Sequence, residues 1–252
     1  MSETKAPLIS IITVVRNNVR GINRALKSVL EQNLQDFEYF IVDGCSTDGT
    51  VESINRIQDP RLTIISEPDC GIYDAMNKGV ALARGRWLFF LGSDDALADP
   101  SVLMDMLYGR DISDVDIVFG RSCFENGECY TSKLDWRINL FNTIHHQSAF
   151  YSQRLFEGFR FRKEIGVVAD YELNYRAHRE RRNWLFVDRK VSTCSSFGVS
   201  HTSSQFAALF DLATIRRSYI GPVANTFLLT LGMINLAADK SRKAFFPAKR
   251  YR

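Results

Sequence analysis

Two adjacent carboxylates, Asp94 and Asp95, follow the apolar run of residues 87–91 after a Gly-Ser step. Carboxylates at the end of a buried strand are costly unless a cation compensates their charge. Their oxygens are the ligands that Mg²⁺ and Mn²⁺ prefer, and such ions bridge phosphate oxygens. The pair therefore indicates a metal site at Asp94 and Asp95, and capping of a helix near Ser101 is the alternative interpretation.

A second group of chemistry-bearing residues lies in residues 66–79. If this segment is helical from Ile72, then Asp74, Asn77 and Lys78 lie on one turn, at positions i, i+3 and i+4. A carboxylate, an amide and an ammonium group side by side suit the ribose and diphosphate of a nucleotide. An exposed polar helix face is the alternative interpretation.

The elements that must position these groups alternate between strand and helix patterns. Strands are predicted at 8–15, 37–42, 61–65 and 87–91, and helices at 22–32, 51–57 and 72–83. This alternation predicts the α/β class, with a parallel sheet and right-handed crossovers. Ligands of such sheets bind beyond the carboxyl ends of the strands. The polar segments 16–18, 43–50 and 93–95 are therefore expected to converge on one site.

The second half of the chain is less regular. Short strands are predicted at 116–120 and 127–131, a helix at 170–180 and a strand at 183–188. No internal repeat is present, and no break in the pattern marks a second compact domain.

The composition excludes several classes of protein. The 252 residues are 45% hydrophobic and 24% charged, which excludes disordered, collagen-like and low-complexity chains. The five cysteines are scattered and odd in number, and no C-x-x-C pair occurs among them. The pattern therefore predicts reduced thiols in a cytosolic protein, rather than a disulfide framework or a zinc site.

The charge is distributed unevenly. The formal net charge is +3, but residues 239–252 hold six bases and one acid, so the remainder is slightly acidic. This distribution argues against a nucleic-acid partner. The basic tail either contacts an anionic membrane surface or is a solvated terminus. Residues 218–238 carry no charge. A membrane span, an interfacial helix, and a core or oligomer helix all remain open for them. No secretory signal is visible, because residues 7–15 read better as a buried strand.

Four motifs in order carry a resemblance to a known family. They are residues 8–18, the stretch Ile41-Val42-Asp43-Gly44-Cys45-Ser46-Thr47-Asp48-Gly49-Thr50, residues 67–79, and the stretch Phe90-Leu91-Gly92-Ser93-Asp94-Asp95. Together they resemble family 2 glycosyltransferases, above all the bacterial enzymes of capsule, O-antigen and exopolysaccharide assembly. The resemblance implies a GT-A fold, which is a Rossmann-like, mostly parallel sheet flanked by helices. It would span residues 1–215, with a nucleotide-sugar-binding half (1–100) and an acceptor-binding half (101–215). A helical, basic extension (216–252) would follow.

The resemblance also implies roles for single residues. Thr13 would line the base pocket, Asp43 would hold the nucleoside, and Asn17 and Ser93 would belong to the donor-binding loops. Asp74, Asn77 and Lys78 would lie along the donor ribose and diphosphate. Asp94 and Asp95 would hold Mn²⁺ or Mg²⁺. Asp170 would be the general base, for which helix capping is the alternative. His146 is either an acceptor contact or a packed histidine, and His201 would touch the metal or phosphate when its loop closes.

Two positions depart from the family pattern. Gly92 stands where the metal motif usually begins with an aspartate, and Gly44 stands where a second acid often contacts the base. The expected function is inverting transfer from a nucleotide-sugar, most simply a UDP-sugar, to a saccharide or lipid-linked saccharide. The expected place is the cytoplasmic face of the inner membrane, with the oligomeric state open. The rivals are a degenerate homologue, which the two glycines favour, and a nucleotidyltransferase. The second rival lacks support because residues 16–21 are not a Gly-rich phosphate loop.

Overall fold

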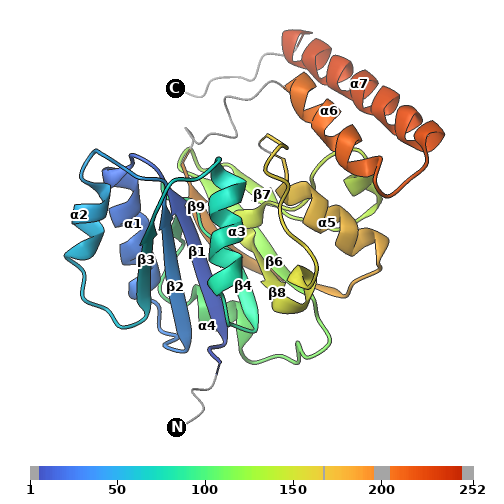
Figure 1. Ribbon diagram of the computed structural model, residues 1–252. Helices are drawn as coiled ribbons and strands as arrows, with labels where there is room; N and C mark the ends of the chain where they lie inside the picture. Colours follow the sequence, from blue (N-terminus) through green and yellow to red (C-terminus); the bar gives the residue numbers. More distant parts are fainter. Residues whose placement is uncertain (1–5, 167, 196–204, 246–252) are drawn as a thin grey trace.

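A nine-stranded sheet with helices on both faces forms the centre of the protein (Figure 1). The computed structural model describes residues 6–166, 168–195 and 205–245, and the elements below refer to these. The strand order is β3-β2-β1-β4-β8-β6-β9-β5, and β7 pairs with β6. The strands are β1 (Ile9–Val15), β2 (Phe37–Asp43), β3 (Leu62–Ser66), β4 (Trp87–Phe90), β5 (Ala96–Leu97), β6 (Ile117–Phe124), β7 (Cys129–Thr131), β8 (Ala149–Ser152) and β9 (Trp184–Cys194). The helices are α1 (Val19–Leu30), α2 (Thr50–Asn55), α3 (Ile72–Leu82), α4 (Val102–Leu107), α5 (Asp170–Arg179), α6 (Gln205–Arg216) and α7 (Pro222–Phe245), with 3₁₀ turns at Trp136–Asn139, His146–Ser148 and Gln153–Phe156.

The strands β3, β2, β1 and β4 form the predicted parallel half of the sheet. β1 pairs in parallel with β2 and with β4, and β2 pairs in parallel with β3. Alternate residues of β1 enter different cores: Ile11 packs with α1, α2 and α4, whereas Ile12 packs with α3 and α5. Because both faces are covered, the central strands are apolar throughout, as expected for a buried parallel sheet. The predicted α/β class is confirmed here.

The second half of the sheet is mixed. β8 runs antiparallel to both β4 and β6, and β5 runs antiparallel to β9. Neither β8 nor β5 was expected from the sequence, since four and two residues are too short to show a clear period. β6 and β9 were expected but are longer than predicted, because pairing with each other extends both strands.

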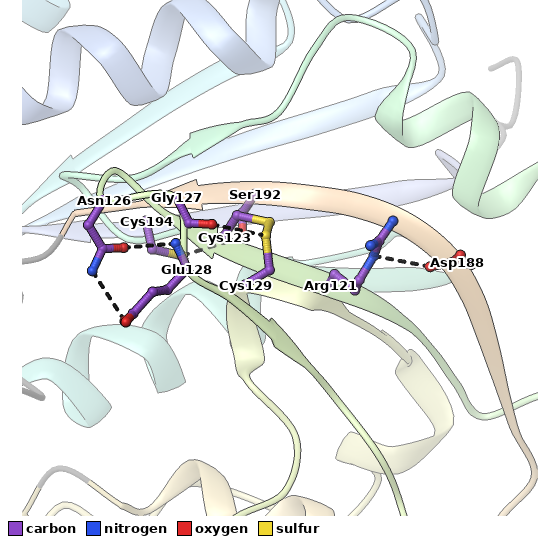
Figure 2. Close-up of a disulfide and its surroundings, with 9 residues drawn as sticks. All are labelled: Arg121, Cys123, Asn126, Gly127, Glu128, Cys129, Asp188, Ser192 and Cys194. Carbon is purple, nitrogen blue, oxygen red and sulfur yellow. Dashed lines mark hydrogen bonds and ion pairs between the residues drawn. A yellow bond between two sulfur atoms is a disulfide. The ribbon is translucent and has the colours of Figure 1, made fainter. Parts of the chain in front are cut away.

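A disulfide joins Cys123 of β6 to Cys129 of β7 (Figure 2). The two residues are direct partners across the antiparallel hairpin that turns at Gly127. The prediction of reduced thiols is therefore wrong for this pair. Residue spacing did not reveal it, because the bridge depends on the register of the hairpin. Cys45, Cys70 and Cys194 are free, and only Cys194 is buried.

The C-terminal part folds as two helices that lie side by side at one end of the sheet, next to α5 (Figure 1). Pro222 begins α7, a position where its missing N–H is not needed. The buried Arg216 of α6 donates to the carbonyl oxygen of Leu140 at 3.4 Å and to Asn225 Oδ1 at 3.3 Å. Arg216 thus links the helix pair to the loop before β8. Within the described residues, no helix is long and apolar enough to span a bilayer.

Candidate active site

A cavity of about 490 Å³ opens at the carboxyl ends of β1 and β4. Its lining includes Asn17, Asp69, Ser93, Asp94, Asp95 and His146. Parallel strands present their carboxyl ends at the same edge of the sheet, so this is the place where the topology gathers ligand-binding loops. The structure thus brings together five of the predicted site residues and adds Asp69.

Three loops are tied to one another around this cavity. Asn17, at φ 51°, accepts a hydrogen bond from Thr47 N–H at 2.8 Å through its side chain, and its own N–H donates to Ser46 Oγ at 2.7 Å. The neighbouring Asn18 caps α1 and donates to Ser93 Oγ at 3.1 Å. The loops after β1, β2 and β4 are therefore fixed relative to one another.

Asp43 ties the loop after β2 to the end of β3 by hydrogen bonds. Its carboxylate is fully buried and accepts hydrogen bonds from Ser46 N–H at 3.0 Å and from the Ser66 hydroxyl at 2.7 Å. Thr13 is also fully buried, with its hydroxyl 2.9 Å from the Tyr39 hydroxyl. Neither side chain lines the cavity. Both side chains therefore stabilise the strand ends and the loop after β2 beneath the cavity.

The carboxylate pair is asymmetric. Asp94 is partly exposed, whereas Asp95 is 3% exposed and accepts a hydrogen bond from Ser195 N–H at 2.9 Å. Burial raises the pKa of the Asp95 carboxyl, and the charge of Asp94 adds to this effect. The residue at the start of α4 is Ser101, so helix capping does not account for the pair. A buried carboxylate with a raised pKa beside a second carboxylate is typical of a functional site.

The space above Gly92 explains the first departure from the motif. A Cβ atom at Gly92 would lie 2.4 Å from Asp95 Oδ2 and 3.3 Å from Asp94 Oδ1. Both carboxylates therefore converge on a point that a side chain at residue 92 would fill. Two convergent carboxylate oxygens fit a divalent cation that takes its other ligands from phosphate and water. The described residues contain no cluster of three or more His, Cys, Asp or Glu side chains suited to a metal.

The second departure, Gly44, has a similar explanation. A Cβ atom at Gly44 would lie 2.4 Å from Asp69 Oδ2. Asp69 Oδ1 accepts a hydrogen bond from Gly71 N–H at 2.9 Å, which fixes this carboxylate in the cavity wall. No role was expected for Asp69 from the sequence. In the sequence, the Glu-Pro-Asp run before α3 is the feature that could have pointed to Asp69. The position of Asp69 next to Gly44 depends on the tertiary structure.

The polar turn of α3 has the predicted spacing but lies outside the cavity lining. Asp74 accepts a hydrogen bond from Cys70 N–H at 2.9 Å and pairs with Lys163 at 3.2 Å, and these contacts lower the pKa of Asp74. Asn77 both donates to and accepts from the backbone of Phe161, at 2.8 and 2.9 Å. These two side chains hold the segment near residue 161 against α3.

Lys78 forms an ion pair with Glu67 at 2.8 Å and also donates to the carbonyl oxygen of Pro68. The contact with Glu67 raises the pKa of Lys78, so its ammonium group is charged at neutral pH. Its side chain is 23% exposed at the base of the loop that carries Asp69.

Asp170 is the first residue of α5, and Ala169 occupies the N-cap position. The capping interpretation is therefore wrong. Asp170 Oδ2 accepts a hydrogen bond from Asn142 at 2.9 Å and lies 3.4 Å from His146 Nδ1, while Oδ1 lies 3.3 Å from the Tyr73 hydroxyl. His146 also lines the cavity, so it connects Asp170 with the carboxylate pair. His201 lies outside the described residues.

Comparison with known proteins decides the family. The family model described as glycosyl transferase family 2 matches residues 10–183. The chain belongs to this family. A PGL/p-HBAD biosynthesis glycosyltransferase of Mycobacterium tuberculosis is 35% identical over 186 residues, which are 68% of this chain and 66% of that protein. The chain thus matches slightly less than two thirds of that relative's length.

Solved structures of glycosyltransferases show the same fold. Staphylococcus aureus TarS (residues 1–349, with UDP-GlcNAc) matches with a TM-score of 0.72 and 17% identity, over 96% of this chain and 76% of that one. The mannosyltransferase PcManGT from Pyrobaculum calidifontis, with GDP-Man and Mn²⁺, matches with a TM-score of 0.66 and 18% identity, over 94% and 76%. At this level of identity the likeness shows the fold alone, and it confirms the expected GT-A architecture.

A second cavity, of about 840 Å³, lies at the amino ends of the same strands of this family 2 protein. It is the larger of the two, but Leu8 is the one residue of the four motifs in its lining. Its arginines are engaged: Arg84 pairs with Glu38 at 2.8 Å and Arg154 pairs with Asp116 at 3.2 Å. The smaller cavity is the candidate active site because it holds the convergent carboxylates.

Proposed function

We propose that this protein is an inverting glycosyltransferase that moves a sugar from a UDP-sugar to a hydroxyl of a saccharide or lipid-linked saccharide acceptor. One observation carries the proposal. The cavity at the strand ends holds the convergent carboxylates of Asp94 and Asp95, and His146 in the same cavity contacts Asp170. This arrangement supports a diphosphate site with a carboxylate base nearby, as direct displacement requires.

The donor half of the proposed site is residues 1–100. Asn17, Asp69 and Ser93 line the cavity and would contact the donor, on a floor fixed by Thr13 and Asp43. Lys78 would reach the diphosphate by exchanging Glu67 for a phosphate oxygen, whereas Asp74 and Asn77 hold the neighbouring segment. UDP is the nucleotide that we assign, and the structure of TarS with UDP-GlcNAc supports this choice.

Asp94 and Asp95 would hold Mn²⁺ or Mg²⁺. Bound there, a divalent cation supplies positive charge against the diphosphate that leaves. The Mn²⁺ complex of PcManGT supports the assignment of a metal.

Asp170 would accept the proton of the acceptor hydroxyl while that oxygen attacks the anomeric carbon. The new bond joins this oxygen to the sugar, and the bond from the sugar to the diphosphate breaks on the opposite face. The configuration at the anomeric carbon is therefore inverted. Residues 101–215 would form the acceptor half, with His146 at the boundary between the two halves.

A membrane surface is the partner that we propose for the C-terminal helices, at the cytoplasmic face of the inner membrane. Val223, Phe227 and Ile234 of α7 share one helix face and are 83%, 63% and 60% exposed. The chain beyond this face is rich in Lys and Arg. An apolar face next to basic residues suits the headgroup region of anionic lipids.

The test is a thermal-shift panel of nucleoside diphosphates and nucleotide sugars, with and without Mn²⁺. At a hundredfold excess over Kd, a ligand stabilises the native state by about 2.7 kcal/mol. We expect UDP and one UDP-sugar to raise the Tm only with Mn²⁺, and Asp94→Asn to abolish this shift. Asp188→Asn, which changes an exposed aspartate outside the cavity, should keep it. A folded protein that responds to no nucleotide would overturn the proposal and favour a degenerate homologue.

A further inference from the structure

A buried chain of hydrogen bonds leads from β8 to the carboxylate of Asp170. The Tyr151 hydroxyl donates to Asn174 Oδ1 at 3.0 Å, and Asn174 Nδ2 donates to Asn142 Oδ1 at 3.1 Å. Asn142 Nδ2 then donates to Asp170 Oδ2 at 2.9 Å. Tyr151 and Asn174 are 1% and 0% exposed, so water does not compete for these bonds.

The direction of this chain is determined at its Asp170 end. An ionised carboxylate only accepts hydrogen bonds, so Asn142 must turn its NH₂ group toward Asp170. The carbonyl oxygen of Asn142 then faces Asn174, which must also present its NH₂ group. The carbonyl oxygen of Asn174 is left for the Tyr151 hydroxyl. Burial holds the pKa of Tyr151 far above its ordinary value, so this hydroxyl stays protonated and donates.

The two oxygens of Asp170 are therefore not equivalent. Oδ2 receives the Asn142 amide and lies 3.4 Å from His146 Nδ1. Oδ1 accepts a hydrogen bond from the Tyr73 hydroxyl at 3.3 Å. Burial and the charge of Asp170 keep the pKa of Tyr73 well above its ordinary value, so Tyr73 stays protonated and remains a donor. Asn142 and Tyr73 thus each hold one oxygen of Asp170, and the bond from Asn142 is the shorter one.

We propose that Asn142, oriented by Asn174 and Tyr151, is a positioning residue that fixes the orientation of the Asp170 carboxylate through its bond to Oδ2. The inference rests on the proposed function for its catalytic meaning, while the hydrogen-bonded chain itself does not. Asn142 lies in the loop between β7 and β8, outside the cavity lining, so it acts through Asp170.

Two variants test the chain by different means. Asn142→Ala removes the donor to Oδ2. Asn174→Asp keeps the shape but offers a carboxylate, which draws the NH₂ group of Asn142 away and turns its oxygen toward Asp170. Both changes remove the hydrogen bond that Oδ2 of Asp170 accepts from Asn142. Asn139→Ala is the matched control, because Asn139 lies in the same loop and bonds only to the Trp136 carbonyl oxygen among the described contacts.

The first readout is the ¹³C NMR chemical shift of the Asp170 side-chain carboxyl, which needs no activity. We expect this signal to move in Asn142→Ala and in Asn174→Asp, because each variant loses the hydrogen bond to Oδ2, and to stay in place in Asn139→Ala. Tyr151→Phe is the milder second variant if Asn174→Asp does not fold, and it should move the signal by a smaller amount. An unchanged signal in folded Asn142→Ala would overturn the inference.

The second readout separates kcat from KM for sugar transfer. In Asn142→Ala, kcat should fall about tenfold because the base is less well oriented. The KM for the donor should stay within about twofold. A purely structural role would lower the Tm and leave the kcat of the folded variant unchanged, and that result would overturn the inference. If the Asp170 carboxyl signal moves as expected but the wild-type protein transfers no sugar, the proposed function fails and the positioning contact stands.

Discussion

The side chain of Asp95 occupies the space directly above Gly92, where a Cβ atom would approach its Oδ2 to 2.4 Å. Gly92 is thus the residue that admits the buried carboxylate of Asp95. The same relationship holds between Gly44 and Asp69. Gly92 faces the carboxylate of Asp95 from its own loop, and Gly44 faces the carboxylate of Asp69 from the loop before α3.

Gly92→Ala should therefore damage the proposed metal site. The added methyl group must displace the Asp95 carboxylate, which costs about 1–3 kcal/mol of stability by overpacking. Mn²⁺-dependent UDP binding should weaken roughly tenfold or more, as expected when a ligand residue loses its position. Isothermal titration calorimetry measures this, with Gly221→Ala as the control because a Cβ there meets no atom within 4 Å. Unchanged metal-dependent binding in Gly92→Ala would contradict the assignment of Asp95.

Asp170→Asn should separate chemistry from binding. The substitution keeps the shape of the side chain and removes its ability to accept a proton. We expect turnover to fall by ~10²-fold or more while UDP affinity stays nearly unchanged. Steady-state kinetics and calorimetry on the same preparation check this. Loss of UDP binding together with turnover would instead give Asp170 a structural role.

The Cys123–Cys129 bridge should be visible in the isolated protein. Intact mass spectrometry after alkylation should find three modified cysteines, and all five after reduction. Closing a loop of this length is worth about 2 kcal/mol, so Cys129→Ser should lower the Tm by about 4–8 °C. Cys70→Ser, which changes an exposed free thiol, should leave the Tm unchanged. Five alkylated cysteines without reductant would show that the thiols stay reduced, as a reducing cytoplasm favours.

The exposed face of α7 should bind anionic vesicles. Phe227→Ser together with Ile234→Ser removes two apolar contacts, and truncation after Ala238 removes the basic end. Either change should release protein from vesicles that contain anionic lipid, and added salt should release the wild type. Co-sedimentation with vesicles measures the bound fraction. Trp136→Ser is the control, because Trp136 is 67% exposed in a different part of the surface. Equal binding of all variants would leave α7 without a membrane role.

Much of the site was predictable because it depends on local pattern. The apolar run of β1 and the spacing of α3 follow from periodicity, and the polar loops after β1, β2 and β4 were expected at one edge of a parallel sheet. Asp94, Asp95 and His146 were predicted on these grounds and on the family motifs, and they line one cavity. Direct donor contacts by Thr13 and Asn77 stay predictions, since both side chains bond within the protein here.

The sequence by itself determined the α/β class, the family and the approximate place of the site, because hydrophobic period and short motifs are local properties of the chain. Only the tertiary structure decided which side chains meet. The Asn142–Asp170 bond, the approach of Asp69 to Gly44 and the Cys123–Cys129 bridge each depend on strand register or on loop packing. The physical reason is that such contacts join residues whose distance is set by the packed sheet and helices, while spacing along the chain reports only on neighbours within one element.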